Sequence, residues 1–167
     1  MSKHIAELFR YLTAGVYVVG VADGDRRDAF TASSIMQVSF SPLLVAVSVN
    51  PENASYSLLS TGRVFAISVL GMQQRALAKH FGTQSGRTVD KLASIPWRPG
   101  KTGAPLLTDA LAHFDCRLVS DMDAGDHRLV LGRVVDGAIV SAAGNPLIYA
   151  QTGDLDMSES LYPDAFC

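Results

Sequence analysis

The chain has 167 residues, of which 48% are apolar and 18% charged, enough apolar material for one packed core and too little charge for a disordered chain. The net charge is −2 and no basic run occurs, so composition gives no support to a nucleic-acid surface. The apolar runs are too short to cross a bilayer, which excludes a helical membrane segment from the prediction.

The compartment is predicted from the N-terminus and the cysteines. MSKHIAELFRYL lacks the apolar stretch of a signal peptide. Cys116 and Cys167 are far apart in sequence, which argues against a disulfide framework and favours a cytoplasmic protein. A mean hydropathy of +0.20 is high for a small domain, so we expect some apolar surface to be buried against another subunit.

The N-terminal third predicts a helix followed by strands. Residues 3–13 carry apolar side chains at helical spacing, and residues 15–22 are rich in β-formers. The polar segment 23–28 begins with Asp-Gly, a hairpin signal. After Pro42, the continuous apolar run at 43–50 predicts a strand that is buried on both faces.

The remainder of the chain alternates short helices with further strands. The expected elements are a helix at 53–61 closed by Gly62, a strand at 64–70, a helix at 72–83, an irregular connection at 82–105 and strands at 111–121, 128–140 and 146–151. A turn at 123–127 joins two of these strands. The acidic tail from Asp154 is expected to be loosely held. Six or seven strands with turn signals favour a mostly β, antiparallel barrel over a parallel sheet.

Several familiar kinds of catalytic site have no sequence support. The chain contains no G-x-G-x-x-G after a strand, no P-loop and no G-x-S-x-G. Its four histidines are scattered and its cysteines lack ligand spacing, so we expect no metal site. An organic cofactor, which brings its own reactivity, is the chemistry that this composition leaves open.

The stretch TASSIMQVSFSP, at 31–42, is the most informative segment. It places the hydroxyl side chains of Thr31, Ser33, Ser34, Ser39 and Ser41 among apolar residues, just before the buried strand. Small polar residues let a backbone approach a flat ligand and bond to its polar edge. The alternative is a Ser/Thr-rich loop whose hydroxyls bond to their own backbone, and composition alone favours this second interpretation.

The order of several segments resembles the flavin reductase-like family of short-chain NAD(P)H:flavin oxidoreductases. The resemblance covers about 10–153 and includes GVYVVGVA, TASSIMQVSFSPLLVAVSVN, VFAISVLGMQQRALAKHFG, WRPGKTGAPLLTDALAHFDCRLV, GDHRLVLGRVV and PLIYAQTGDL. It implies one domain over 1–167, with a tail at 154–167. It also implies an FMN-binding split β-barrel and a homodimer with the flavin near the subunit interface.

The resemblance also implies roles for individual residues. The residues expected to contact the flavin are Thr31, Ala32, Ser33 and Ser34 at the ring edge, Ser48, Val49 and Asn50 along the ribityl chain or ring, Ser55 at the phosphate, and Phe81 and Gly82 as a cover. His127 and Tyr149 would face the side where nicotinamide enters. His127 could equally be an exposed turn residue, and Tyr149 an interface or core aromatic. Cys116 is expected to be a small buried hydrophobe.

Two positions depart from the family pattern. Asn53 stands where a basic residue is common, so the phosphate would depend on Ser55, on backbone amides, or on a cation from Arg75, Lys79, Arg87 or Lys91. Phe30 stands where glycine is expected, which could narrow the ring pocket.

The predicted function is reduction of FMN or FAD by NAD(P)H, with hydride transfer to the flavin N5 and delivery of reduced flavin to a partner such as a monooxygenase. One alternative is a non-catalytic flavin- or haem-binding module that acts as a carrier or sensor, for which the departures at Asn53 and Phe30 argue. A second, weaker alternative is a purely structural or interaction barrel.

Overall fold

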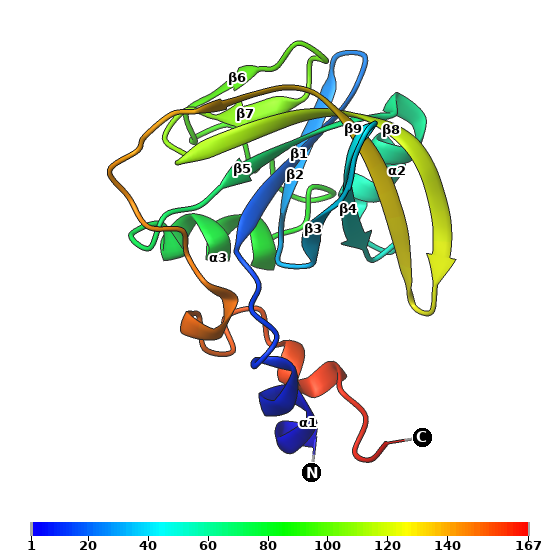
Figure 1. Ribbon diagram of the computed structural model, residues 1–167, viewed down its shortest axis with the longest axis vertical. Helices are drawn as coiled ribbons and strands as arrows, with labels where there is room; N and C mark the ends of the chain where they lie inside the picture. The colour runs from blue at the N-terminus through cyan, green and yellow to red at the C-terminus, as the bar shows by residue number, and fades with distance from the viewer. Residues whose placement is uncertain (1, 167) are drawn as a thin grey trace.

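A computed structural model describes residues 2–166 as one curved antiparallel sheet surrounded by helices and loops, with the N-terminal helix and the C-terminal segment extending beyond one end of the sheet (Figure 1). The sheet has seven strands in the order β2-β1-β5-β8-β9-β4-β3. These strands are β1 (Tyr17–Asp23), β2 (Arg26–Ala32), β3 (Ile35–Phe40), β4 (Leu43–Val49), β5 (Val64–Val69), β8 (Ala112–Ala124) and β9 (His127–Ile139). The sheet does not close, which confirms the expected mostly β split barrel.

The sequence of β1 does not alternate between apolar and polar residues, because both faces of this strand are covered. Val19 and Val21 point into the barrel, where they pack with Phe65 and Ile67. Val18 points the opposite way, into a second cluster that lies under α3 (Arg75–Thr83). The barrel interior and the layer outside β1 therefore form two separate apolar cores.

The opening of the barrel lies between two strands that are consecutive in sequence. β2 and β3 occupy opposite edges of the sheet, so the short link at 33–34 passes from one edge to the other. The amide of Ser48 in β4 donates to the carbonyl of Ser34, which ties this link to the far side of the opening. The segment TASSIMQVSFSP therefore contains the end of β2, the link at 33–34 and the whole of β3. Strand β3 was not predicted from the sequence.

The helices lie close to their expected positions, with altered ends. α1 is Ser2–Phe9, shorter than the 3–13 expected, and α3 begins at Arg75 rather than at residue 72. α2 is Ala54–Gly62 and ends at Arg63, whose φ of 56° is left-handed. The predicted closure at Gly62 was therefore wrong by one residue. Within residues 2–166, no helix is long and apolar enough to span a membrane.

The connection after α3 contains two short strands, β6 (Trp97–Pro99) and β7 (Pro105–Leu107), which pair with each other. The two other differences from prediction lie near the C-terminus. Residues 146–151 are not a strand: they make isolated bridges at Pro146 and Ile148 and then the 3₁₀ turn η1 (Tyr149–Gln151). The tail from Asp154 is also not loose, because η2 (Ser158–Leu161) packs against α1, and Arg10 pairs with Glu159 at 3.1 Å.

Candidate functional site

Three connected cavities follow the opening of the barrel. An inner cavity beside α3 is lined by Thr31, Ala32, Ser33, Gly82 and Tyr149, among others. It shares Thr31 and Gly82 with an α2-side cavity of about 310 Å³, and Ser33 and Tyr149 with an outer cavity of about 640 Å³. Because neighbouring cavities share lining residues, the three adjoin one another in a row from the start of α2 across the opening to β9, and we call this row the groove.

The inner part of the groove is lined by small residues. Ala78 and Gly82 lie four residues apart on one face of α3, where helical periodicity brings them together over β2. A Cβ atom built on Gly82 would lie 3.4 Å from the Cβ of Thr31, so any larger side chain at this position would enter the groove. The hydroxyl of Thr31 donates to the carbonyl of Ala78 at 2.7 Å and fixes β2 against the helix.

The serines of the crossing are free to bond to a ligand. Within residues 2–166, the hydroxyls of Ser33, Ser34 and Ser48 make no hydrogen bond to another protein group, although all three line the outer cavity. This finding weighs against the local-bonding interpretation of the segment, because even the Thr31 hydroxyl bonds outside it, to the carbonyl of Ala78 in α3. The donors and acceptors left over face the space between the two sheet edges.

One end of the groove is suited to an anion. Asn53 caps α2 by accepting from the amide of Ser55 at 3.0 Å, and it lines the α2-side cavity together with Arg87. The Arg87 guanidinium donates to the carbonyl of Glu52 at 3.0 Å, so it lies at the N-terminus of α2. A helix N-terminus and an arginine both favour negative charge.

The four cationic residues considered for the α2 end of the groove lie in different environments. Lys91 is buried against Asp28 and Arg75 donates to the carbonyl of Thr152, so neither is free at the start of α2. Lys79 is exposed on α3. Arg87 alone of the four lines the α2-side cavity.

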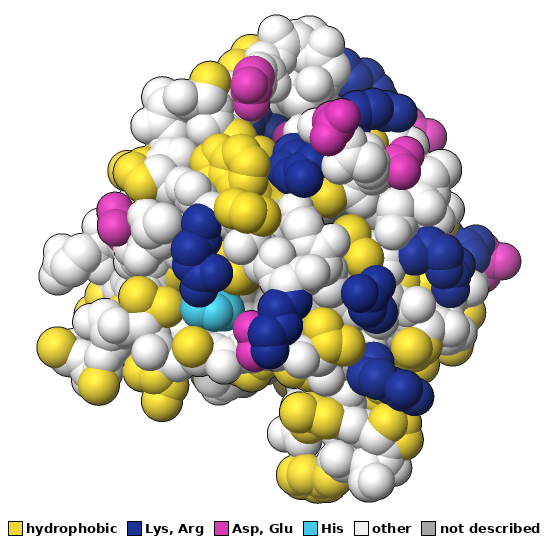
Figure 2. Space-filling model, turned by 90° about the horizontal axis from the view of Figure 1, so that it is seen from above, with side chains coloured by type: hydrophobic (Ala, Val, Ile, Leu, Met, Phe, Trp, Pro, Cys, Tyr) yellow, Lys and Arg dark blue, Asp and Glu magenta, His cyan; other side chains and the backbone are white. Residues whose placement is uncertain are grey.

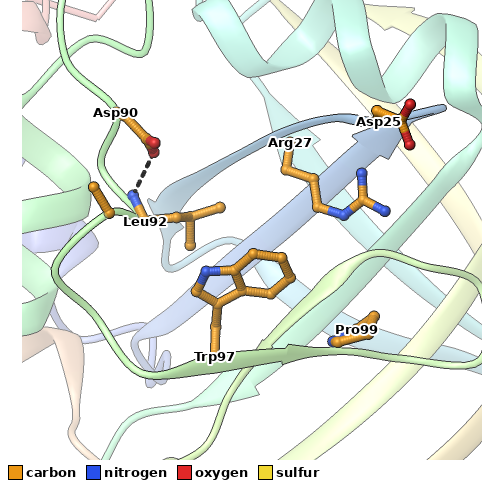
Figure 3. A pocket seen from close by; sticks show the side chains of 7 residues that line it. Asp25, Arg27, Asp90, Leu92, Trp97 and Pro99 are labelled. Atoms are coloured by element: carbon orange, nitrogen blue, oxygen red, sulfur yellow. Dashed lines mark hydrogen bonds between the residues drawn. The ribbon is translucent and has the colours of Figure 1, made fainter.

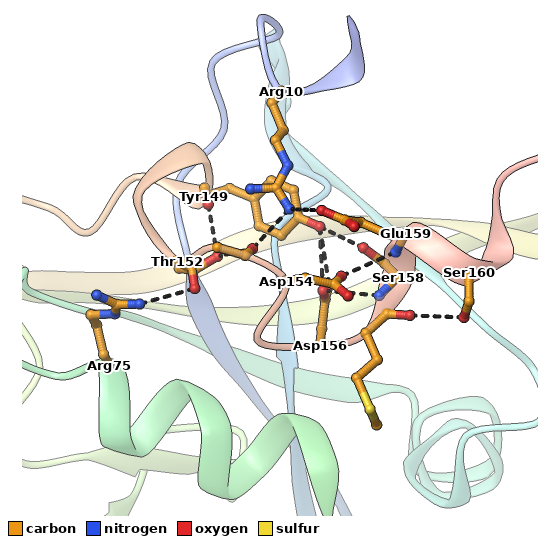
Figure 4. A network of polar contacts seen from close by, with 11 residues as sticks. Arg10, Arg75, Tyr149, Thr152, Asp154, Asp156, Ser158, Glu159 and Ser160 are labelled. Atoms are coloured by element: carbon orange, nitrogen blue, oxygen red, sulfur yellow. Dashed lines mark hydrogen bonds and ion pairs between the residues drawn. The ribbon is translucent and has the colours of Figure 1, made fainter. Parts of the chain in front are cut away.

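The other end of the groove carries His127 and Tyr149. His127 Nδ1 donates to Asp126 Oδ1 at 2.7 Å, and this hydrogen bond lowers the pKa of the Asp126 carboxyl below its ordinary value. The Tyr149 hydroxyl lies 2.8 Å from the hydroxyl of Ser158 and 3.1 Å from Asp156 Oδ2 (Figure 4). Burial raises the pKa of Tyr149 above its ordinary value. The C-terminal segment therefore forms one wall of the outer cavity.

Three expected contacts, Ser55, Val49 and Asn50, lie outside the lining of the groove. Ser55 is fully buried and its hydroxyl donates to Asp28 at 2.7 Å, so its side chain bonds inside the protein. Val49 belongs to the barrel core and is 1% exposed. Asn50 is exposed and accepts from the amide of Glu52. Phe81 does line the α2-side cavity beside Gly82, but it is 1% exposed and packs mainly in the core below α3.

Phe30, expected to narrow the ring pocket, packs mainly in the barrel core and is 4% exposed, and its remaining surface lines the α2-side cavity. Sequence reasoning also missed some of the lining, namely Ala78, Thr152, Leu155 and Asp156. The helical spacing of Ala78 and Gly82 could have indicated the first of these. The others depend on how the C-terminal segment folds back, for which the sequence carries no local signal.

The family model for the flavin reductase like domain matches residues 9–156. The chain belongs to this family. A similar curated protein is the high molecular weight rubredoxin of Moorella thermoacetica, 36% identical over 141 residues, which represent 83% of this chain and 61% of that protein. The chain thus spans less than two thirds of this relative's length.

Two solved structures have closely similar folds. The NADH:FAD oxidoreductase SgcE6 of Streptomyces globisporus has a TM-score of 0.80 and 32% identity, with 86% of both chains covered. BorF, the flavin reductase component of a bacterial two-component tryptophan halogenase, also has a TM-score of 0.80 and 32% identity, with 89% of this chain and 93% of its own covered.

Proposed function

We propose that this protein is an NAD(P)H-dependent flavin reductase whose flavin lies in the groove along the barrel opening. The observation that carries the proposal is the continuity of the groove from Asn53 and Arg87 to His127 and Tyr149, with unbonded serine hydroxyls between them. Family membership supports the same activity. A bound flavin supplies the redox chemistry, accepting hydride from NAD(P)H at N5.

The residues present fit a flavin. The inner cavity is about 90 Å³, room for only part of a flavin ring, and its small side chains at Ala32, Ser33 and Gly82 let that part approach the backbone closely. The hydroxyls of Ser33, Ser34 and Ser48 in the adjoining outer cavity are available to the polar edge of the ring. At the opposite end, Arg87 and the start of α2 would hold a phosphate. The protein's part is to bind and orient the ring and to exclude water from its inner side.

The outer cavity is proposed to admit the nicotinamide. It is wide enough for a second ring, and His127 and Tyr149 lie on its walls. His127 would position the nicotinamide amide through its second ring nitrogen, because Asp126 already accepts from the first. Tyr149 would border the same space, with its hydroxyl held by Ser158 and Asp156.

A homodimer is proposed from the apolar side chains that β3, β8 and β9 expose. These strands expose Met36, Phe40, Met122 and Ile139, with fractions between 44% for Met122 and 88% for Phe40. Met122 lies opposite Leu129 and Ile139 opposite Ala112, so these side chains are spread along the sheet, where a second subunit would bury them. Light scattering after size exclusion tests this proposal, and a mass of 17.8 kDa would refute it because that is the mass of one chain.

Delivery of reduced flavin to a monooxygenase or halogenase is proposed by analogy with BorF, which is one component of such a pair. The cytoplasmic location stays a prediction from sequence.

Steady-state oxidation of NADH and of NADPH, each with FMN and with FAD, tests the reductase activity. We expect turnover that depends on both nucleotide and flavin. Flavin binding without nicotinamide oxidation would instead support the carrier or sensor alternative. Absence of any flavin binding would refute both proposals.

A further inference from the structure

The groove continues beyond its anion-binding end. A shelf of about 370 Å³ lies next to the α2-side cavity and shares Ala54 and Arg87 with it. The shelf in turn shares Arg27 with a cavity of about 450 Å³ that is built around Trp97. Both additional cavities follow the free edge of β2 toward the β1–β2 turn, away from the region expected to hold the isoalloxazine ring.

The shelf is strongly basic. Arg26, Arg27 and Arg87 all line it, and within residues 2–166 none of these guanidinium groups forms an ion pair. Arg27 donates only to the carbonyls of Gly24 and Arg26, so its charge is not compensated. Seen from the side of β6, β7 and the β1–β2 turn, the surface carries many Lys and Arg side chains (Figure 2).

The carboxylate of Asp28, which also lines the shelf, would not repel a bound anion. Asp28 is paired with the buried ammonium of Lys91 at 3.4 Å and also accepts from Ser55. Its negative charge is thus compensated from inside the protein. The shelf therefore presents the positive charges of its three arginines to any ligand that extends from the α2-side cavity toward the β1–β2 turn.

The cavity beyond the shelf has a different character. The Trp97 indole and the Arg27 side chain extend into the same space, with Leu92 beside the indole and Pro99 at the rim (Figure 3). Asp25 and Asp90 are exposed at its margin. An aromatic face suits a nucleobase, while carboxylates accept hydrogen bonds from ribose hydroxyls and base amino groups.

We propose that the shelf and the Trp97 cavity bind the adenosine diphosphate part of FAD, with the diphosphate along Arg87, Arg26 and Arg27 and the adenine on Trp97. This inference rests on the proposed function, because it extends the flavin from the same groove. Phe30 lines the α2-side cavity, and Arg27, three residues earlier in β2, lines both the shelf and the Trp97 cavity. At a strand's rise per residue the two positions are about 10 Å apart, a span that suits the part of FAD beyond the FMN phosphate. The protein is thus expected to prefer FAD to FMN.

The test is flavin binding by fluorescence quenching, with FMN and FAD titrated separately into the purified protein. We expect FAD to bind about tenfold more tightly than FMN, in line with the worth of one aromatic–base contact. Arg27→Gln and Trp97→Leu should each remove most of this preference and leave FMN affinity within about twofold. Arg117→Gln is the matched control, since it removes the same charge from an exposed site in β8, three strands from β2.

The possible outcomes separate this inference from the function on which it rests. Equal affinity for FMN and FAD, or equal loss of both in Arg27→Gln, would overturn the FAD site while leaving a flavin site in place. If Arg27→Gln raised the KM for NADH with FMN as the flavin and left the FAD preference unchanged, the adenosine would be that of the nucleotide and the FAD assignment would be wrong. Failure of both flavins to bind would refute the proposed function as well. Trp97 packs on the core under α3, so the partly exposed Arg27 serves as the variant that does not disturb packing.

Discussion

The ammonium of Lys91 lies 3.4 Å from the carboxylate of Asp28 inside the protein, with only 2% and 8% of the two side chains exposed. Asp28 also accepts from the Ser55 hydroxyl and from the amide of Ala29. The pair therefore joins β2, α2 and the connection after α3. Burial lowers the pKa of Lys91 below its ordinary value, and the Asp28 charge opposes this effect.

Lys91→Met is expected to lower the free energy of unfolding by about 3–5 kcal/mol, because it leaves a buried carboxylate without its counter-charge. Chemical denaturation measures this change. The double variant Asp28→Asn/Lys91→Met should recover part of the loss, since no buried charge is then unpaired. A single variant as stable as the wild type would show that the pair contributes nothing.

Gly82→Leu is expected to weaken FMN binding at least tenfold, because the new side chain extends from α3 toward Thr31 and fills the inner cavity. Equilibrium titration of FMN measures the loss. Ala76→Leu on the exposed side of the same helix is the matched control and should leave binding unchanged. Unaltered binding in Gly82→Leu would place the flavin outside the groove.

Arg87→Ala is expected to lower FMN affinity by about 10- to 100-fold, the range for loss of a charge-assisted hydrogen bond to phosphate. Riboflavin has no phosphate, so its affinity should stay within twofold of the wild-type value. Lys79→Ala removes a nearby exposed charge and serves as the control. An equal effect on both ligands would mean that Arg87 acts on the fold of the loop rather than on phosphate.

His127→Gln is expected to raise the KM for NAD(P)H about tenfold without changing the dissociation constant of the flavin, because His127 lines only the outer part of the groove. Steady-state kinetics and flavin titration on the same preparation separate the two effects. His4→Gln, an exposed histidine of α1, controls for loss of an imidazole. An unchanged KM would assign His127 to the turn alone.

The Cys116 thiol is fully buried, and burial raises its pKa from 9.0 to about 12. Between these values the unfolded chain loses the thiol proton and the folded protein keeps it, so the thiol's contribution to stability is complete below pH 9 and declines as pH rises toward 12. From pH 8 to pH 10 the wild type should therefore lose about 1.4 kcal/mol more than Cys116→Ala. Urea unfolding at both pH values measures this difference. Identical losses would contradict the neutral buried thiol.

The chain's local patterns determined most of its elements. The β-rich and apolar segments of β1, β4 and β5 predict strands, of which β4 is expected to be buried on both faces, and the Asp-Gly turn predicts the first hairpin. Residues 146–151 were wrongly predicted as a strand. Their sequence is apolar, but they pair with the rest of the chain only through isolated bridges at Pro146 and Ile148. β3 was missed because its alternation is broken by exposed apolar side chains such as Met36 and Phe40.

The sequence by itself indicated which segment carries the candidate site, since TASSIMQVSFSP joins small hydroxyl residues to a buried strand and matches a family pattern. Tertiary structure decided which of those residues have free hydroxyls. It also decided that Ser55 bonds to Asp28 rather than facing the groove, and that Arg87 rather than Lys91 lies at its anion-binding end. The physical reason is that burial and pairing depend on contacts between segments far apart in the chain, as when Lys91 meets Asp28 across the loop and the edge of the sheet.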